Sequence, residues 1–154
     1  MPRFDAVVNQ NACRRRRPAF QARCYHGRVS RPVSFADVRR RVLEFGERAN
    51  VVTVTPEGLP HVVSAVVRVD GERLVIRVGP RTHTNLAARP SLTLTWPPRG
   101  DGEYLLILDG QAEAIGEPDD GGVRPVSIAV GRGILHRLAE LSEPGPSCVV
   151  LGAD

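Results

Sequence analysis

Residues 61–78 have the pattern of two β-strands joined by a tight turn, and this pattern constrains the fold more than any other feature of the chain. The first run is "HVVSAVVRV", the second is "ERLVIRV", and Asp70-Gly71 stands between them. Asp-Gly between alternating runs is a strong hairpin signal, because glycine accepts the positive φ that this turn requires. In the second run, alternate residues from Leu74 to Val78 are apolar, so one face of the strand is predicted to be buried.

Five further segments are predicted as strands from their β-branched content or their alternation. They are residues 50–55, 91–96, 103–117, 123–130 and 146–151. Asp109-Gly110 predicts a bulge or bend in the long segment 103–117. Residues 131–141 fit either a strand or a helix. Short strands and tight turns together predict a mainly β chain with six or so strands in a closed, or nearly closed, antiparallel barrel.

One or two short helices accompany these strands. Residues 34–48 have apolar residues at helical spacing, with Ser34 as N-cap and Asp37 as a weak capping box. A second helix is predicted within "THTNLAAR", residues 82–89, beginning near Thr84 and ended by Pro90.

Positive charge is concentrated at the N-terminus. Residues 1–31 hold eight arginines and one acid, a charge of +7, whereas the remaining residues hold thirteen arginines and sixteen acids, a charge of −3. Residues 1–32 also lack hydrophobic periodicity, so we predict a basic, disordered tail before a single domain over 33–154. A basic arm can bind nucleic acid, but this one lacks interleaved aromatic residues, so nucleic acid is not the partner we expect.

The composition excludes several classes of site. The three cysteines show no paired spacing, which predicts reduced thiols and no metal site, and the absence of lysine excludes a lysine Schiff base. With no run of 18 apolar residues and no secretory signal, we expect a cytoplasmic protein without a membrane span. Asp119 and Asp120 stand in a glycine-rich segment, where turn formation explains them better than acid–base catalysis.

The stretch "RVGPRTHTNLAARP", residues 77–90, is the candidate binding feature. Arg77 and Arg81 could both face the turn after the strand, beside the free N–H groups of the helix that follows. A helix N-terminus beside arginine favours an anion such as phosphate. The alternative is a solvated loop with a threonine N-cap.

Residues 34 to about 117 resemble the pyridoxamine 5′-phosphate oxidase-like family of FMN-binding split barrels. The resemblance lies in the order of a helix, "VVTVTPEGLP", the Asp-Gly hairpin, the polar stretch leading to "NLAARP", and a strand carrying "DGQAE". It implies a six-stranded antiparallel split β-barrel and a homodimer that binds FMN, or alternatively a deazaflavin coenzyme, at the subunit interface.

The resemblance also implies a set of cofactor-binding residues. Arg81 matches the first of two basic residues that hold the phosphate in the family, and Thr82 stands where the second is common. Trp96 is expected near the subunit interface. The full implied set is Arg81, Arg77, Val78, Thr82, His83, Asn85, Arg68, His61, Val63 and Ser64.

The sequence departs from the true oxidase at Tyr104-Leu105, where that enzyme carries an Arg-Gln pair. Vitamin B6 oxidation is therefore not expected. An FMN-dependent oxidoreductase of unknown substrate is the first hypothesis, with no catalytic residue assigned. A deazaflavin-dependent reductase and a non-enzymatic flavin- or haem-binding module are the alternatives, and a nucleic-acid-associated protein acting through the tail is the last.

Overall fold

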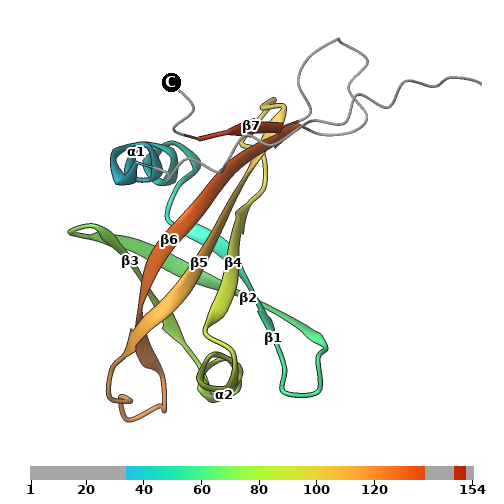
Figure 1. Cartoon of the computed structure of the whole chain (residues 1–154). Helices are drawn as coiled ribbons and strands as arrows, with labels where there is room; N and C mark the ends of the chain where they lie inside the picture. Colours follow the sequence, from blue (N-terminus) through green and yellow to red (C-terminus); the bar gives the residue numbers. More distant parts are fainter. Residues whose placement is uncertain (1–33, 138–147, 152–154) are drawn as a thin grey trace, which may run out of the picture.

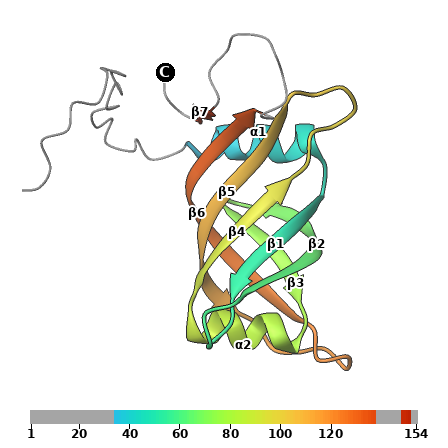
Figure 2. The ribbon, with the colours of Figure 1, turned by 90° about the vertical axis from the view of Figure 1, so that its right-hand side faces the viewer.

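The chain forms an antiparallel barrel with a helix at each end (Figure 1). The computed structural model describes residues 34–137 and 148–151. Its elements are α1 (Phe35–Phe45), β1 (Arg48–Val54), β2 (Pro60–Asp70), β3 (Arg73–Val78), α2 (Pro80–Ala88), β4 (Ser91–Trp96), β5 (Tyr104–Ile115), β6 (Arg124–Arg137) and β7 (Cys148–Val150). Figure 2 shows the strands crossing between α1 at one end and α2 at the other.

Six strands close the barrel in the order β3-β2-β1-β4-β5-β6, and a pairing of β3 with β6 joins the two ends. Residues 74–78 of β3 pair antiparallel with residues 124–128 of β6. The second half of β6 continues beyond this seam and pairs with β7. These pairings confirm the predicted six-stranded antiparallel barrel.

Helix α1 covers one end of the barrel through Val38 and Val42, which are buried. Ser34 caps it as predicted, since its Oγ accepts a hydrogen bond from the Asp37 N–H at 3.3 Å and donates one to the Asp37 carboxylate at 2.7 Å. The helix ends at Phe45 rather than at residue 48, because Gly46 has a φ of +93° and turns the chain out of the helix.

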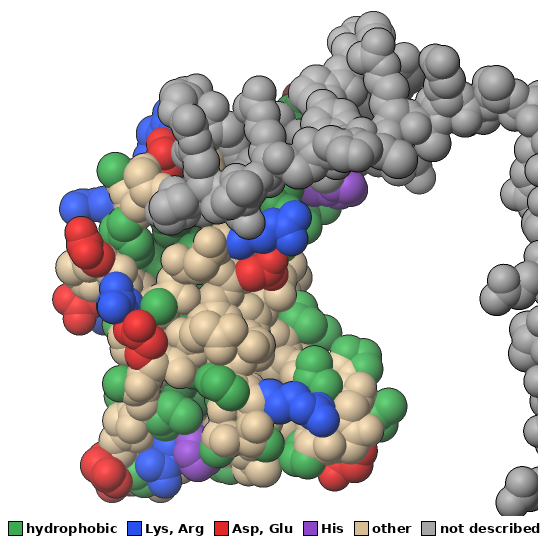
Figure 3. Space-filling view, in the orientation of Figure 1, with side chains coloured by type: hydrophobic (Ala, Val, Ile, Leu, Met, Phe, Trp, Pro, Cys, Tyr) green, Lys and Arg blue, Asp and Glu red, His purple; other side chains and the backbone are tan. Residues whose placement is uncertain are grey.

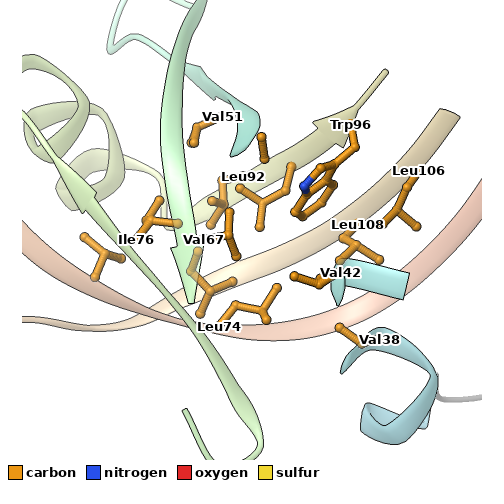
Figure 4. Close-up of a cluster of buried hydrophobic side chains, with 14 of the residues drawn as sticks. Val38, Val42, Val51, Val67, Leu74, Ile76, Leu92, Trp96, Leu106 and Leu108 are labelled. Atoms are coloured by element: carbon orange, nitrogen blue, oxygen red, sulfur yellow. The ribbon is translucent and has the colours of Figure 1, made fainter. Parts of the chain in front are cut away.

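The core lies inside the barrel and consists largely of the alternating apolar side chains that the sequence predicted to be buried. Figure 4 shows Leu74 and Ile76 of β3 in the same cluster as Trp96 of β4 and Val42 of α1. Trp96 lies inside the barrel with 1% of its surface exposed. Its Nε1–H donates to the Gly46 carbonyl at 2.8 Å and thereby fastens the end of α1 to β4.

The long strand β5 is irregular where the sequence predicted a bulge. Its register with β6 shifts between Asp109 and Gly110. A Cβ at Gly110 would lie 2.7 Å from the Ala129 carbonyl oxygen, so this close approach of backbones requires glycine. The ambiguous residues 131–137 belong to strand β6 because they pair with the start of β5.

Some sequence expectations concern residues outside the described part of the chain. The basic tail, residues 1–32, and the end of the ambiguous segment, residues 138–141, are among them. Neither of the two helices in the described part is long and apolar enough to span a membrane.

Candidate functional site

Helix α2 begins at Pro80, four residues before the predicted start near Thr84. Proline at the first helical position is favourable because its fixed φ suits the helix and it lacks an N–H that would be unsatisfied there. Consequently Arg81 and Thr82 lie in the first helical turn, not in a loop. Thr84 is no N-cap, since its hydroxyl donates back to the Pro80 carbonyl at 3.1 Å.

The first turn of α2 offers backbone hydrogen-bond donors that have no partner in the described part of the chain. The N-cap residue, Gly79, supplies no side-chain acceptor, and its carbonyl is bonded to the His83 N–H. This leaves the backbone N–H groups of Arg81 and Thr82 at the positive end of the helix. The Arg81 side chain is exposed and makes no hydrogen bond or ion pair within the described residues. The turn therefore combines two backbone donors with an exposed guanidinium.

On the side of this turn that faces the barrel, α2 contributes side chains to a buried polar network. The Thr82 hydroxyl lies 3.3 Å from His61 Nε2, and Asn85 Nδ2 donates to Thr53 Oγ1 at 3.0 Å. Thr82, Asn85 and Thr53 are each at most 3% exposed. Their side chains therefore connect α2 to β1 and β2. The Thr82 hydroxyl belongs to this network. The donor that Thr82 can provide to a ligand at the helix end is therefore its backbone N–H.

Two of the predicted arginines are placed differently from Arg81. Arg77 is ion-paired with Asp119 of the β5–β6 turn, so its charge is already neutralised. Asp119 also accepts hydrogen bonds from two backbone N–H groups of that turn, which confirms its interpretation as a turn residue. Arg68 is opposite Val75 on β3, about 10 Å along the strand from the end of β3 at the usual rise per residue.

The remaining predicted residues lie at different positions along the barrel, and Val63 and Ser64 pair with Val51 and Asn50 in the first half of β1. Val78 is buried at the end of β3, and His83 is half-buried in α2. Val63 is partly buried against the core, whereas Ser64 is exposed on the outer face of β2 and donates to Asn50 at 3.0 Å. The structure thus joins His61 and Thr82 directly and links Asn85 to His61 through Thr53, and no printed contact joins the other predicted residues to this group.

Two functional candidates near Arg81 were not identified from the sequence. Arg89, at the end of α2, donates to the Thr55 carbonyl at 2.6 Å and so ties α2 to the β1–β2 turn. In that turn, a hydrogen bond from Thr55 lowers the pKa of Glu57 below its usual value, as do the Glu57 backbone N–H and, further, the charges of Arg81 and Arg89. The only sequence signal was the position of Glu57 in the "PEGLP" turn.

Comparison of the sequence with known proteins identifies relatives that are themselves named as uncharacterized. No family model matches the chain. Over 79 residues it is 43% identical to an uncharacterized protein of Mycobacterium bovis and, to the same extent, to one of Mycobacterium tuberculosis. These matches cover 49% of this chain, which spans about half, 55%, of the curated relatives.

Comparison with solved structures identifies the class of fold. A protein of the pyridoxinephosphate oxidase family from Clostridium acetobutylicum has a TM-score of 0.57 at 14% identity, covering 76% of this chain and 93% of that one. A structure named F420 reductase has a TM-score of 0.54 at 18% identity, covering 61% and 94%. A haem-binding protein from Mycobacterium smegmatis has a TM-score of 0.52 at 19% identity, covering 79% and 59%.

These likenesses confirm the fold that the sequence predicted. The chain has the split-barrel fold of the pyridoxamine 5′-phosphate oxidase-like proteins. Within that class, the solved structures include one named F420 reductase and one named haem-binding protein.

Proposed function

We propose that this chain is an FMN-binding member of the pyridoxamine 5′-phosphate oxidase-like family and that it acts as an oxidoreductase. The observation that carries the proposal is the first turn of α2 in a barrel of this fold. There, Arg81 and two backbone N–H groups have no partner within the residues that the structure describes. A flavin bound there would supply the hydride chemistry, while the protein supplies binding and orientation.

The residues present fit the phosphate of such a cofactor. An arginine side chain donates two parallel hydrogen bonds to phosphate oxygens, and a helix N-terminus favours the negative charge. Arg81 and the backbone N–H groups of Arg81 and Thr82 are therefore the proposed phosphate ligands. His61 and Thr82 would act indirectly, because their contact at 3.3 Å orients the turn that carries Arg81.

The cofactor would lie between two copies of the chain. The outer faces of β1 and β2 expose apolar side chains, among them Val54, Val62 and Val66, which are 37%, 57% and 43% exposed. Figure 3 shows hydrophobic side chains on the surface over this hairpin. Apolar residues gathered on one surface commonly mark an interaction site, and we propose that a second copy covers this one.

The proposal is tested by titrating the purified protein separately with FMN, coenzyme F420 and haem. Quenching of flavin fluorescence by the protein, with a rise in melting temperature, is expected for FMN. Binding of F420 instead would favour the deazaflavin-dependent reductase, and binding of haem would favour the haem module. If none of the three raises the melting temperature, the proposal fails.

Turnover separates an enzyme from a cofactor-binding module. With FMN bound, oxidation of NADH or NADPH above the rate of free FMN is expected for an oxidoreductase. A protein that binds FMN tightly but adds nothing to that rate would be a flavin-binding module. Equilibrium sedimentation with and without FMN measures whether the binding form is a dimer.

A further inference from the structure

A groove of about 540 Å³ crosses the outer face of the barrel over β1, β4, β5 and β6. Figure 2 shows these strands side by side, with β2 next to β1. Several of the residues that line the groove have short side chains or none, among them Ser91, Thr93, Gly110, Ala129 and Gly131. The outer face is therefore hollowed where its side chains are small.

A ridge of exposed apolar side chains lies beside this groove, at the start of β2. The ridge consists of Leu59 in the β1–β2 turn and Val62 of β2, which are 64% and 57% exposed. Val62 is directly opposite Val52 of β1, and Val52 lines the groove. Covering such side chains stabilises an assembly by roughly 25 cal/mol for each Å² of apolar surface removed from water. One face thus holds an apolar ridge and a hollow that adjoin each other.

The polar side chains of this face bond to one another. Three hydrogen bonds join side chains on neighbouring strands: Ser64 to Asn50, Thr93 to Asp109, and Gln111 to Ser91. Burying a polar group costs much less when it is hydrogen-bonded, so these bonds reduce the cost of covering the face. The two charged residues that line the groove, Asp109 and Arg132, have opposite signs and lie 3.9 Å apart. The groove therefore has no net charge that would repel an identical surface or attract a polyanion.

The face is large enough for a stable dimer. Strands in a sheet lie about 4.8 Å apart and rise about 3.3 Å per residue, so five strands of about seven residues cover roughly 500 Å² in projection. The accessible surface of a face covered by side chains is larger than its projection. Two such faces therefore provide more than about 1,000 Å², the area expected of a specific interface.

We propose that a second copy of the chain sits on this face reciprocally, with the ridge of each copy in the groove of the other. A two-fold interface brings the same surface of both copies together, so that surface must be complementary to itself. A ridge and a groove on one face meet this requirement, with the two-fold axis near β1. The inference rests on the dimer of the proposed function and assigns the surface that receives the partner.

Gly131 allows the groove to be filled without disturbing the monomer. It is the extra residue of the bulge in β6, because Val130 pairs with Gly110 and Arg132 pairs with Asp109. No atom lies within 4 Å of a Cβ built at Gly131, and its φ is not positive. Gly131→Phe should therefore place a ring at the groove and leave the barrel folded.

Sedimentation equilibrium of the full chain measures the dissociation constant of the dimer. The groove variant is Gly131→Phe, and the ridge variant carries Leu59→Ser and Val62→Ser, which shorten exposed side chains. Loss of one ridge–groove contact should weaken association about tenfold, so each homodimer, which loses two, should dissociate about 100-fold more readily. The matched control is Ala36→Phe, which adds the same ring to an exposed position on α1 and should change nothing. A monomeric unmodified chain, or a dimer that survives both variants, overturns the proposal.

A mixture of the two variants tests whether the ridge and the groove contact each other. In the mixed dimer, one contact has no substitution and the other has all of them, whereas each homodimer has substitutions in both contacts. Independent sites would give the mixed dimer the geometric mean of the two homodimer dissociation constants, apart from the statistical factor of about two. Contact between ridge and groove should instead make the mixed dimer about tenfold tighter than that mean. Native mass spectrometry separates the three dimers by mass, and a mixed dimer at the mean overturns the proposal even if every variant folds.

The flavin proposal and this inference fail in different ways. A dimer that binds FMN but survives both variants refutes the reciprocal arrangement and leaves the flavin site standing. A dimer that passes the mixing test but binds no FMN supports the arrangement and removes the flavin. Urea denaturation of each variant, compared with that of the unmodified chain, distinguishes loss of association from loss of folding.

Discussion

Replacing Arg81 with alanine should weaken FMN binding strongly while leaving the fold almost unchanged. Arg81 is exposed and makes no hydrogen bond or ion pair within the described residues, so its removal should alter the free energy of unfolding by less than about 0.5 kcal/mol. A charge-assisted hydrogen bond contributes about 1.5–3 kcal/mol to binding. The dissociation constant of FMN should therefore rise roughly 10- to 150-fold. Binding is not abolished, because two backbone N–H donors remain at the helix end.

The measurement is a titration of FMN fluorescence, with urea denaturation of each variant as the measure of stability. Arg77→Ala is the matched control, because that arginine is already neutralised by Asp119 and should change the FMN affinity less than about threefold, as for a weak exposed contact. If Arg81→Ala and Arg77→Ala lower the affinity equally, or neither does, the assignment of the phosphate to α2 is wrong.

Glu57 provides a test of opposite sign at the same site. Its carboxylate lies within electrostatic reach of Arg81 and would repel a bound phosphate. Glu57→Gln should therefore strengthen FMN binding, and the gain should shrink at high salt because this carboxylate is exposed. Weaker binding by the variant would mean that Glu57 supports the site rather than opposing it.

Three further predictions concern the fold. Gly110→Ala should destabilise the barrel by about 1–3 kcal/mol in urea, because a Cβ there would lie 2.7 Å from a backbone oxygen of β6. Trp96→Phe should cost about 1–3 kcal/mol, since it leaves the Gly46 carbonyl without the indole donor; an unchanged denaturation midpoint would contradict this. The hydrogen bond from Ser34, more than the nearby arginines, lowers the pKa of Asp37 below 3.8. The stabilisation of the fold by the ionised Asp37 carboxylate should be complete above about pH 3.8 and lost as the pH falls through the lowered pKa. The variant Asp37→Asn should lack this part of the acid sensitivity.

The local strand pattern predicted most of the barrel, because alternation in a strand directly reports which face is buried. Leu74 and Ile76 are buried as their alternation required. The pairing of β3 with β6 could not be predicted from the local sequence. It joins residues 74–78 to residues 124–128, and no local pattern specifies such a distant partner. The barrel itself was expected only from the number of strands and the family resemblance.

The candidate site shows how a small error in a helix boundary changes the interpretation of side chains. With a start near Thr84, Thr82 stands in a loop and its hydroxyl is free to face a ligand. With the start at Pro80, Thr82 and Asn85 are three residues apart on one helical face and enter the barrel together. The signal was present in the sequence, because proline is common at the first position of a helix. The pairing of Arg77 with Asp119, in contrast, depends on the β5–β6 turn and could not be predicted locally.

The seam between β3 and β6 also has a consequence for how fast the chain folds. The pairs β1–β2, β2–β3, β4–β5 and β5–β6 join strands that are consecutive in the sequence. The β1–β4 pairing and the seam instead each close a loop of roughly 40 to 50 residues, and the seam closes the longer one. Contacts between residues distant in sequence slow folding, because the entropy of loop closure is lost before the contact forms. We therefore expect the barrel to close late, so that substitutions within the seam change mainly the unfolding rate.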